Sequence, residues 1–222
     1  MNGVLQPADW PYSGGLRAGF GDRSSSAGEA AVVRVRQVHG TIVIRADALE
    51  PGVLHEVPGD ALVVTKPGII AAVATADCVP ILLLEPEARW AAAVHAGWRG
   101  TLAGILSRTL DAAREDGIAP ERMLAAIGPA IGGCCYEVGD DLAESFAVAG
   151  LPVTRAAGRA KATLDLRACN EQLLTSAGLR RSRIQFCGPC TRCHAETYHS
   201  YRADRDAAGR QLSWIGWTIQ SP

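Results

Sequence analysis

Short runs of β-branched and aliphatic residues, separated by glycine and proline turns, occur along much of the chain. Such runs predict strands, and several are apolar at consecutive positions, which is typical of strands buried on both faces of a sheet. The runs cover residues 31–38, 41–45, 61–65, 69–75, 80–84, 90–95, 123–127, 184–187 and 211–218. The chain is therefore expected to be rich in buried strands.

Helical spacing replaces the strand pattern in three other segments. Apolar residues recur every three or four positions over residues 101–117, with Thr101 as the predicted N-cap. Asp141 and Glu144 have the spacing of a capping box and predict the start of a second helix. Residues 166–177 predict a third helix.

The order of these elements predicts the fold class. The strands come in clusters and do not alternate regularly with helices, so we expect an α/β fold, a single-domain layered sandwich with a mixed β-sheet. The domain is expected to extend over residues 1–222, because no linker or repeat divides the chain. A glycine- and serine-rich stretch, residues 19–28, is expected to be a surface loop.

Charge and composition narrow the function. The chain has 222 residues, 22 lysines and arginines against 23 acidic residues, and 48% hydrophobic residues. This balance gives no basic face for nucleic acid, and no run is long and apolar enough for a membrane span. Without a secretory leader we expect a cytoplasmic protein, in which the seven cysteines are thiols, metal ligands or nucleophiles and not disulfides.

Three segments each place a possible metal ligand where a strand meets a glycine or proline turn. They are RQVHG with His39, TADCVP with Cys78 and VHAGWRG with His95. Two imidazoles and one thiolate suit zinc with an open fourth position. A buried cysteine and two structural histidines remain the alternative interpretation, because the spacing alone fixes no common site.

Four polar residues lie in the same turns and are candidate substrate-binding residues: Arg36, Gln37, Asp77 and Arg99. The planar guanidinium group matches phosphate, and the glycines beside Arg99 let the backbone approach an anion. An anion site beside the metal is therefore expected. The alternative is an ion pair between Arg99 and Asp77.

The segment GPCTRCHAETYH, residues 188–199, contains three metal-site spellings. Cys190, Cys193 and His194 match a c-type haem attachment motif, and adding Cys187 gives a metal knuckle. The haem interpretation conflicts with the expected compartment. The third motif is the zinc nucleobase-deaminase signature, whose two halves, Pro189-Cys190-x-x-Cys193 and His194-x-Glu196, stand here in reverse order. That site needs ligands from separate helices, which contiguous residues cannot supply. The knuckle lacks the second ligand pair from elsewhere in the chain that a structural zinc site normally uses.

Six ordered motifs resemble the signature segments of the laccase-domain family, whose members are also called polyphenol oxidase or purine nucleoside phosphorylase proteins. They are RQVHG, DALVVTKPG, TADCVPILL, AAVHAGWRG, AIGPAIGGCCYEVG and SYRAD followed by GR. The resemblance implies an α/β sandwich and implies that His39, Cys78 and His95 are zinc ligands. It also implies phosphorolysis of adenosine, inosine, guanosine and methylthioadenosine, and deamination of adenosine.

The chain departs from the family pattern in two places. The segment before RQVHG is shorter, which implies either a reduced substrate pocket or a stretch missing from the sequence. In CTRCHAETYHSYR, Cys190 and Thr191 match the family, whereas Cys193 and His194 look incidental. The name laccase also conflicts with composition: five histidines and no His-x-His pair cannot supply a multicopper oxidase, so zinc is expected and copper is not the expected native metal.

Three functions stay open from the sequence. The first is a zinc-dependent purine nucleoside phosphorylase with adenosine deaminase activity, whose partners are a purine nucleoside and phosphate. The second is a Cys-His hydrolase or amidase, such as one that edits peptidoglycan precursors, with Cys78 as nucleophile and His95 or His39 as base. The third is a non-enzymatic metal-binding or interaction module.

Overall fold

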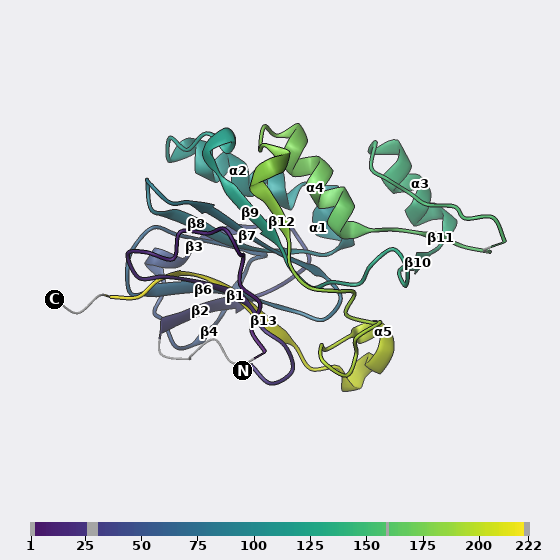
Figure 1. The fold of residues 1–222 in the computed structure, drawn as a ribbon, viewed down its shortest axis with the longest axis horizontal. Coiled ribbons are helices and arrows are strands. Elements are labelled where there is room, and N and C mark those ends of the chain that lie inside the picture. Colours follow the sequence, from purple (N-terminus) through teal and green to yellow (C-terminus); the bar gives the residue numbers. More distant parts are fainter. Residues whose placement is uncertain (1–2, 26–30, 159, 220–222) are drawn as a thin grey trace.

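The computed structural model describes residues 3–25, 31–158 and 160–219 and has a layered architecture. Two β-sheets pack face to face, and helices cover the outer face of one of them (Figure 1). This arrangement confirms the predicted α/β class and the layered sandwich of mixed sheets. No helix within the described part of the chain has the length and apolar character that crossing a membrane requires.

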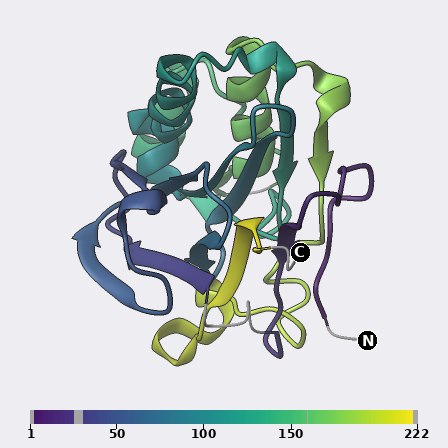
Figure 2. The ribbon, with the colours of Figure 1, turned by 90° about the vertical axis from the view of Figure 1, so that its left-hand side faces the viewer.

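The first sheet has five strands. In spatial order they are β1 (Leu16–Phe20), β13 (Gln211–Trp217), β6 (Ile69–Thr75), β2 (Val32–Arg36) and β4 (Leu54–Pro58). The pairs on either side of β13 are antiparallel, whereas β2 runs parallel to both β6 and β4. Figure 2 shows how this sheet brings the yellow C-terminal strand next to strands from the first half of the chain.

The second sheet has six strands. In spatial order they are β12 (Ile184–Phe186), β9 (Leu124–Ile127), β7 (Val79–Glu85), β8 (Trp90–Ala96), β5 (Ala61–Val64) and β3 (Val43–Arg45). The four central strands are antiparallel to one another. The edge strands are parallel to the strands that they pair with, β12 to β9 and β3 to β5. Every residue of β7 and β8 is buried, because the first sheet covers one face and helices cover the other.

Five α-helices connect or cover these strands among the described residues: α1 (Trp98–Ala103), α2 (Ile105–Glu115), α3 (Asp140–Val148), α4 (Leu166–Ser176) and α5 (Tyr201–Asp204). A two-stranded antiparallel sheet of β10 (Glu137–Val138) and β11 (Ala162–Thr163), which precede and follow α3 in the chain, lies next to that helix. Four short 3-10 helices complete the secondary structure: η2 (Ala46–Ala48), η3 (Pro120–Arg122), η4 (Arg181–Arg183) and η5 (Arg205–Ala207).

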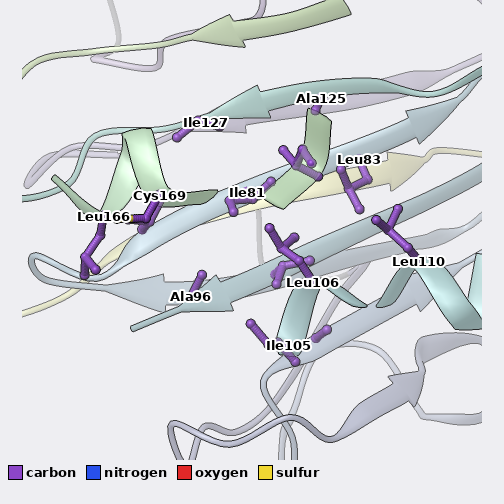
Figure 3. Packing of buried hydrophobic residues seen from close by; sticks show 14 of the residues in the cluster. Ile81, Leu83, Ala96, Ile105, Leu106, Leu110, Ala125, Ile127, Leu166 and Cys169 are labelled. Atoms are coloured by element: carbon purple, nitrogen blue, oxygen red, sulfur yellow. The ribbon is translucent and has the colours of Figure 1, made fainter. Parts of the chain in front are cut away.

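Two apolar layers hold the structure together. One lies between the sheets and includes Phe20, Leu62 and Ile215. The other lies between the six-stranded sheet and the helices, where Leu106 and Leu110 of α2 pack over the sheet (Figure 3). Burying side chains of this size contributes roughly 1.5–3 kcal/mol each. These layers make the strands a rigid support for the residues at their ends.

The structure corrects two of the three predicted helix starts and confirms the third, at Leu166. The helix predicted over 101–117 starts at Trp98, with Gly97 and not Thr101 as N-cap, and it breaks at Gly104, whose φ of 89° only glycine adopts easily. The predicted capping box is also wrong: Gly139 is the N-cap of α3, and Asp141 lies inside the first turn without capping it.

Strand boundaries differ by a few residues, and four strands lie outside the predicted runs: β1, β4 and the two-residue strands β10 and β11. Both β1 and β4 mix polar with apolar residues, which hid them from a search for apolar runs. The loop predicted over 19–28 overlaps the end of β1, and residues 26–28 of that loop lie outside the described residues.

Candidate metal centre and arginine-lined pocket

His39, Cys78 and His95 meet at one end of the sandwich, where the chain crosses between the sheets. His39 lies in the crossing from β2 to β3, and Cys78 lies in the crossing from β6 to β7. His95 lies on β8 opposite Pro80 of β7. The candidate ligand atoms of the three residues all lie within 4.8 Å of one another. The structure thus brings together the three residues that the sequence placed in separate turns.

The buried carboxylate of Asp60 holds two of these residues in place. Its oxygens accept hydrogen bonds from the backbone N–H groups of His39 at 2.9 Å and Gly40 at 2.7 Å. This anchor supports the left-handed backbone of His39, whose φ is 58°. The same carboxylate lies 2.8 Å from Nδ1 of His95. With Nδ1 committed to Asp60, Nε2 of His95 is the nitrogen available for a metal.

Gly97 leaves the space that an ion among the three side chains requires. A Cβ atom at this position would lie 3.0 Å from Cys78 Sγ and 3.1 Å from His39 Cδ2, which is close enough to displace these two side chains. The φ of Gly97 is −75°, so the need for glycine is space and not backbone conformation. Together with the donor set of two imidazoles and one thiolate, this fits a zinc ion with an open position.

The surroundings of Cys78 and His95 shift the pKa values of both side chains. Burial opposes the charged form of Cys78, but hydrogen bonds with His39 and His95 outweigh it and lower the thiol pKa to about 6. Burial likewise opposes the charged form of His95, yet Asp60 and Cys78 raise its pKa to about 9. Without a metal, a thiolate beside a protonated imidazole is therefore favoured at neutral pH.

A pocket of about 770 Å³ opens beside the three candidate ligands. Among the described residues, six arginines line it: Arg34, Arg36, Arg99, Arg202, Arg205 and Arg210. Trp98, Tyr136 and Tyr201 contribute aromatic surface to the same pocket. The cavity can therefore accept a ligand that combines an anionic group with a flat apolar ring.

Two of the predicted substrate-binding residues lie in this pocket with their guanidinium groups accessible. Arg99 is exposed, and its Cζ lies 4.3 Å from the centre of the Trp98 ring. Arg36 is also exposed and lies 3.6 Å from a carboxylate oxygen of Glu56. Arg99 forms no ion pair with Asp77 in the described structure, so the alternative of an Arg99–Asp77 pair is wrong.

Gln37 and Asp77 line the pocket, but their polar atoms are used within the protein. The Gln37 amide both donates to and accepts from the backbone of Ala74, at 2.9 and 2.7 Å. Asp77 accepts hydrogen bonds from the hydroxyl of Thr191 and the backbone N–H of Arg202, both at 2.6 Å. These contacts make the two residues supports of the pocket rim, and their role in binding substrate stays a prediction.

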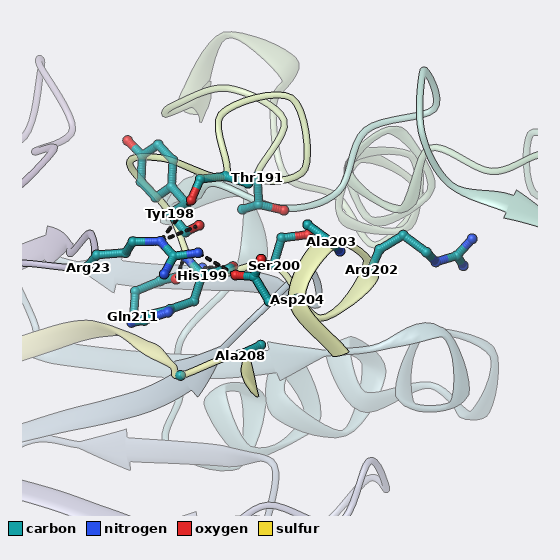
Figure 4. Close-up of polar contacts among 12 residues, drawn as sticks. Arg23, Thr191, Tyr198, His199, Ser200, Arg202, Ala203, Asp204, Ala208 and Gln211 are labelled. Carbon is teal, nitrogen blue, oxygen red and sulfur yellow. Dashed lines mark hydrogen bonds and ion pairs between the residues drawn. The ribbon is translucent and has the colours of Figure 1, made fainter. Parts of the chain in front are cut away.

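The segment before β13 carries three of the arginines and is fixed from both ends. The side chain of Arg23 donates to the carbonyl oxygens of Ala195 and Tyr198 and pairs with Asp204 (Figure 4). Gln211 holds the backbone of His199 through hydrogen bonds of 2.8 and 3.3 Å. Because Gln211 pairs with Thr75 at the end of β6, this segment closes over the 76–78 turn.

Sequence reasoning missed several of these residues. Asp60 and Arg202 stand inside quoted motifs, DALVVTKPG and SYRAD, but nothing in their spacing shows that they face the site. Arg34 and Arg205 carry no local signal, because the pocket assembles arginines from segments far apart in the chain. The basic pocket could therefore not be predicted from the sequence, in which these arginines form no continuous basic run.

The cysteines of the 188–199 segment have different neighbours from those that its spelling suggests. Cys190 and Cys193 lie beside Cys134 and Cys135, with all four sulfurs within 4.8 Å of one another. Nδ1 of His194 lies 3.2 Å from the carbonyl oxygen of Cys190. The ligand set of the contiguous knuckle is therefore wrong, since neither Cys187 nor His194 belongs to this group.

Comparison with known proteins shows the family of this chain. The sequence profile of the family described as multi-copper polyphenol oxidoreductase laccase matches residues 22–218. A purine nucleoside phosphorylase from Deinococcus radiodurans is 42% identical over 184 residues, covering 82% of this chain and 69% of that protein. An adenosine deaminase from an unknown prokaryotic organism is 38% identical over 160 residues, covering 70% and 61% respectively.

Solved structures also resemble this chain. The crystal structure of YlmD from Geobacillus stearothermophilus matches with a TM-score of 0.82 and 27% sequence identity, covering 99% of this chain and 100% of that one. A purine nucleoside phosphorylase of that name and organism is 37% identical over 82% of this chain and 72% of its own length. The chain therefore belongs to the multi-copper polyphenol oxidoreductase laccase family, and its relatives include proteins named purine nucleoside phosphorylase.

Proposed function

We propose that this protein is a zinc-dependent purine nucleoside phosphorylase that acts on adenosine, inosine, guanosine and methylthioadenosine and also deaminates adenosine. One observation carries the proposal: the three candidate zinc ligands open into a pocket lined by six arginines and three aromatic rings. The names of the relatives from Deinococcus radiodurans and from the unknown prokaryote support the two activities.

The arginines supply the binding of phosphate. A guanidinium group offers a planar fork of donors that matches phosphate oxygens, and such charge-assisted hydrogen bonds are stronger than neutral ones. Arg99 is the best placed of the two predicted arginines, because the Trp98 ring supports it and no carboxylate competes for it among the described residues. Arg36, in contrast, lies beside Glu56.

The aromatic side chains supply the binding of the purine. Trp98, Tyr136 and Tyr201 offer flat apolar surface on the pocket wall, and purines stack on such rings. Phosphate held by the arginines would attack the anomeric carbon as the bond to the purine nitrogen breaks, through a state with positive charge on the sugar. The departing purine takes the electron pair of that bond, so the site must stabilise negative charge on the base.

His39, Cys78 and His95 would hold the zinc ion, which supplies Lewis-acid stabilisation of negative charge on the substrate when bound. Asp60 keeps the His95 ring oriented through Nδ1 and keeps His39 in its left-handed conformation. Deamination in the same pocket would use water and not phosphate. The two activities should therefore differ in their need for the arginines and agree in their need for the three ligands.

The test is to follow base release and ammonia release side by side, with and without phosphate, on protein purified without an affinity tag. Inosine should release hypoxanthine only when phosphate is present, and adenosine should also release ammonia when phosphate is absent. Base release from inosine at the same rate without phosphate would show hydrolysis and contradict the phosphorylase proposal.

A second candidate function rests on the same side chains. Cys78, His95 and Asp60 follow one another as nucleophile, base and orienting carboxylate, the arrangement of a Cys-His hydrolase or amidase. Such an enzyme, for instance one that edits peptidoglycan precursors, would work without metal and would be inactivated by alkylation of Cys78. Amide hydrolysis that survives complete removal of zinc would favour this candidate over the phosphorylase.

A further inference from the structure

We propose that Cys134, Cys135, Cys190 and Cys193 bind a second zinc ion with a structural role, separate from the ion proposed at His39, Cys78 and His95. The four sulfurs lie within 4.8 Å of one another, and each can donate one lone pair to a common centre. Four thiolates in tetrahedral arrangement are the ligand set that favours zinc in structural sites.

The distances between the sulfurs fit such a centre. Cys193 Sγ lies 3.6 Å from Cys134 Sγ and 3.4 Å from Cys135 Sγ, and the last two lie 3.7 Å apart. Zinc–sulfur bonds of about 2.3 Å in a tetrahedron place the sulfurs about 3.8 Å apart. The three measured separations are therefore close to the edges of a four-sulfur zinc site before any ion is added.

The same distances argue against disulfides. A disulfide joins two sulfurs at about 2.05 Å, and all seven cysteines of this chain are free in the structure. Cys193 is nearly equidistant from two sulfurs, so the geometry selects no single partner for a covalent pair. A shared ion satisfies all of these contacts at once.

The backbone of the two loops supports the sulfur cluster. Ala130 pairs with Cys190 in a parallel bridge, and the N–H of Thr191 donates to the carbonyl oxygen of Ala130 at 3.0 Å. The N–H of Gly132 donates to Cys190 Sγ at 3.2 Å, a contact of the kind that orients and stabilises a metal-bound thiolate. The cluster thus joins two loops that are more than fifty residues apart in the chain.

This arrangement supplies the second ligand pair that the 188–199 segment lacks by itself. Cys190 and Cys193 form one pair, and the adjacent Cys134 and Cys135 form the other. Cys193 is therefore assigned a role, contrary to the expectation that it is incidental. His194 is not among the four ligands, and no haem attachment is involved.

The ion would hold one wall of the substrate pocket. Tyr136, directly after Cys135, and Ile131, before it, line that pocket. Thr191, which lies between the other two ligands, donates its hydroxyl to Asp77, the neighbour of Cys78. Fixing these two loops would therefore fix Tyr136 and the turn that carries Cys78, without contact between the second ion and the substrate.

The decisive experiment uses the full chain with the first site removed. The double variant His39→Ala/His95→Ala leaves the sulfur cluster intact and should retain one zinc per chain, against two in the unmodified protein. X-ray absorption at the zinc edge should then show four sulfur neighbours at about 2.3 Å. Loss of all zinc, nitrogen or oxygen ligands in place of sulfur, iron in place of zinc, or a disulfide among the four cysteines would each overturn the proposal.

Variants of the cluster give the complementary result. Cys193→Ser should lower the zinc content of the otherwise unmodified protein from two ions to one and lower its melting temperature. Cys187→Ser is the matched control, because Cys187 lies three residues before Cys190 and is outside the cluster. An unchanged zinc content in Cys193→Ser, or an equal loss in Cys187→Ser, would contradict the assignment.

Discussion

The two sulfur-containing groups of this protein are built on different supports. His39, Cys78 and His95 lie where buried strands end, and the buried carboxylate of Asp60 orients the His95 ring and anchors the backbone of His39. The four-cysteine cluster lies on two surface loops, with Cys134 and Cys193 exposed. The group of His39, Cys78 and His95 offers three ligands that line the arginine-lined pocket. The four-cysteine cluster offers four ligands, none of which lines that pocket.

Under the two proposals, that difference separates a site for chemistry from a site for stability. Zinc with three protein ligands keeps a position for substrate, and zinc with four is closed to it. A rigid support matters most for the open site, because small displacements of reacting groups reduce rates strongly. At the proposed four-cysteine site, the ion itself would add rigidity to the two loops.

The largest expected effect comes from His95→Ala. Because His95 would be a ligand needed for both reactions, phosphorolysis and deamination should each fall by more than about a hundredfold. Zinc content should fall from two ions to one. The assay is base and ammonia release together with metal analysis, and His55→Ala, a histidine of β4 outside the pocket, is the control. Full activity of His95→Ala would contradict the assignment of the chemistry to the group of His39, Cys78 and His95.

Arg99→Ala should separate the two reactions. Losing one charge-assisted contact to phosphate costs on the order of 1.5–3 kcal/mol, or about ten- to a hundredfold in phosphorolysis rate. Deamination of adenosine should be nearly unchanged, because it consumes water. Arg108→Ala on the exposed face of α2 is the matched control. Equal loss of both activities would show that Arg99 holds the nucleoside or the fold and not phosphate.

Asp60→Asn should weaken the first site without removing a ligand. Replacing the carboxylate that orients a zinc-bound histidine typically lowers metal affinity about 10- to 100-fold. Activity should recover in part when zinc is added in excess, and competition with a chelator measures the affinity. A variant that binds zinc as tightly as the unmodified protein would show that Asp60 does not position the His95 ring and the His39 backbone for the metal.

Removing Cys193 should have the smallest effect on the chemistry. Cys193→Ala combined with His194→Ala should leave phosphorolysis within a few-fold, seen as a higher KM and a nearly unchanged kcat. The melting temperature should drop by about 5 °C or more, because a structural ion is lost. Thermal unfolding and steady-state kinetics measure the two effects, and a collapse of kcat with unchanged stability would reverse the roles assigned to the two clusters.

The two clusters also differ in how far the sequence predicts them. Each of the first three ligands stands in a motif at the edge of an apolar run, so the periodic pattern located His39, Cys78 and His95 near strand ends. The partners of Cys193 stand in another motif, GGCCYEVG, and only the pairing of Ala130 with Cys190 brings the two together. The motif within residues 188–199 and its neighbour Cys187 therefore indicated the wrong ligand set, because Cys187 and His194 lie outside the four-cysteine cluster.

The fold shows the same division between local and long-range information. The predicted bounds of β6 and β8 match the structure almost to the residue, because each strand is a nearly continuous apolar run, interrupted only by Thr75 and His95. The helix start at Trp98 and the break at Gly104 were missed, since they depend on how the chain leaves β8. Arg34 and Arg205 reach the pocket through the topology of the sheets, which no local pattern encodes.

The most direct test of the central claim is phosphate-dependent release of hypoxanthine from inosine, measured on one tag-free preparation before zinc removal, after it and after zinc is restored. The account predicts release only when both zinc and phosphate are present, with activity lost on chelation and regained with zinc. Release that persists in the zinc-free protein, or that is absent with zinc and phosphate both supplied, would contradict it.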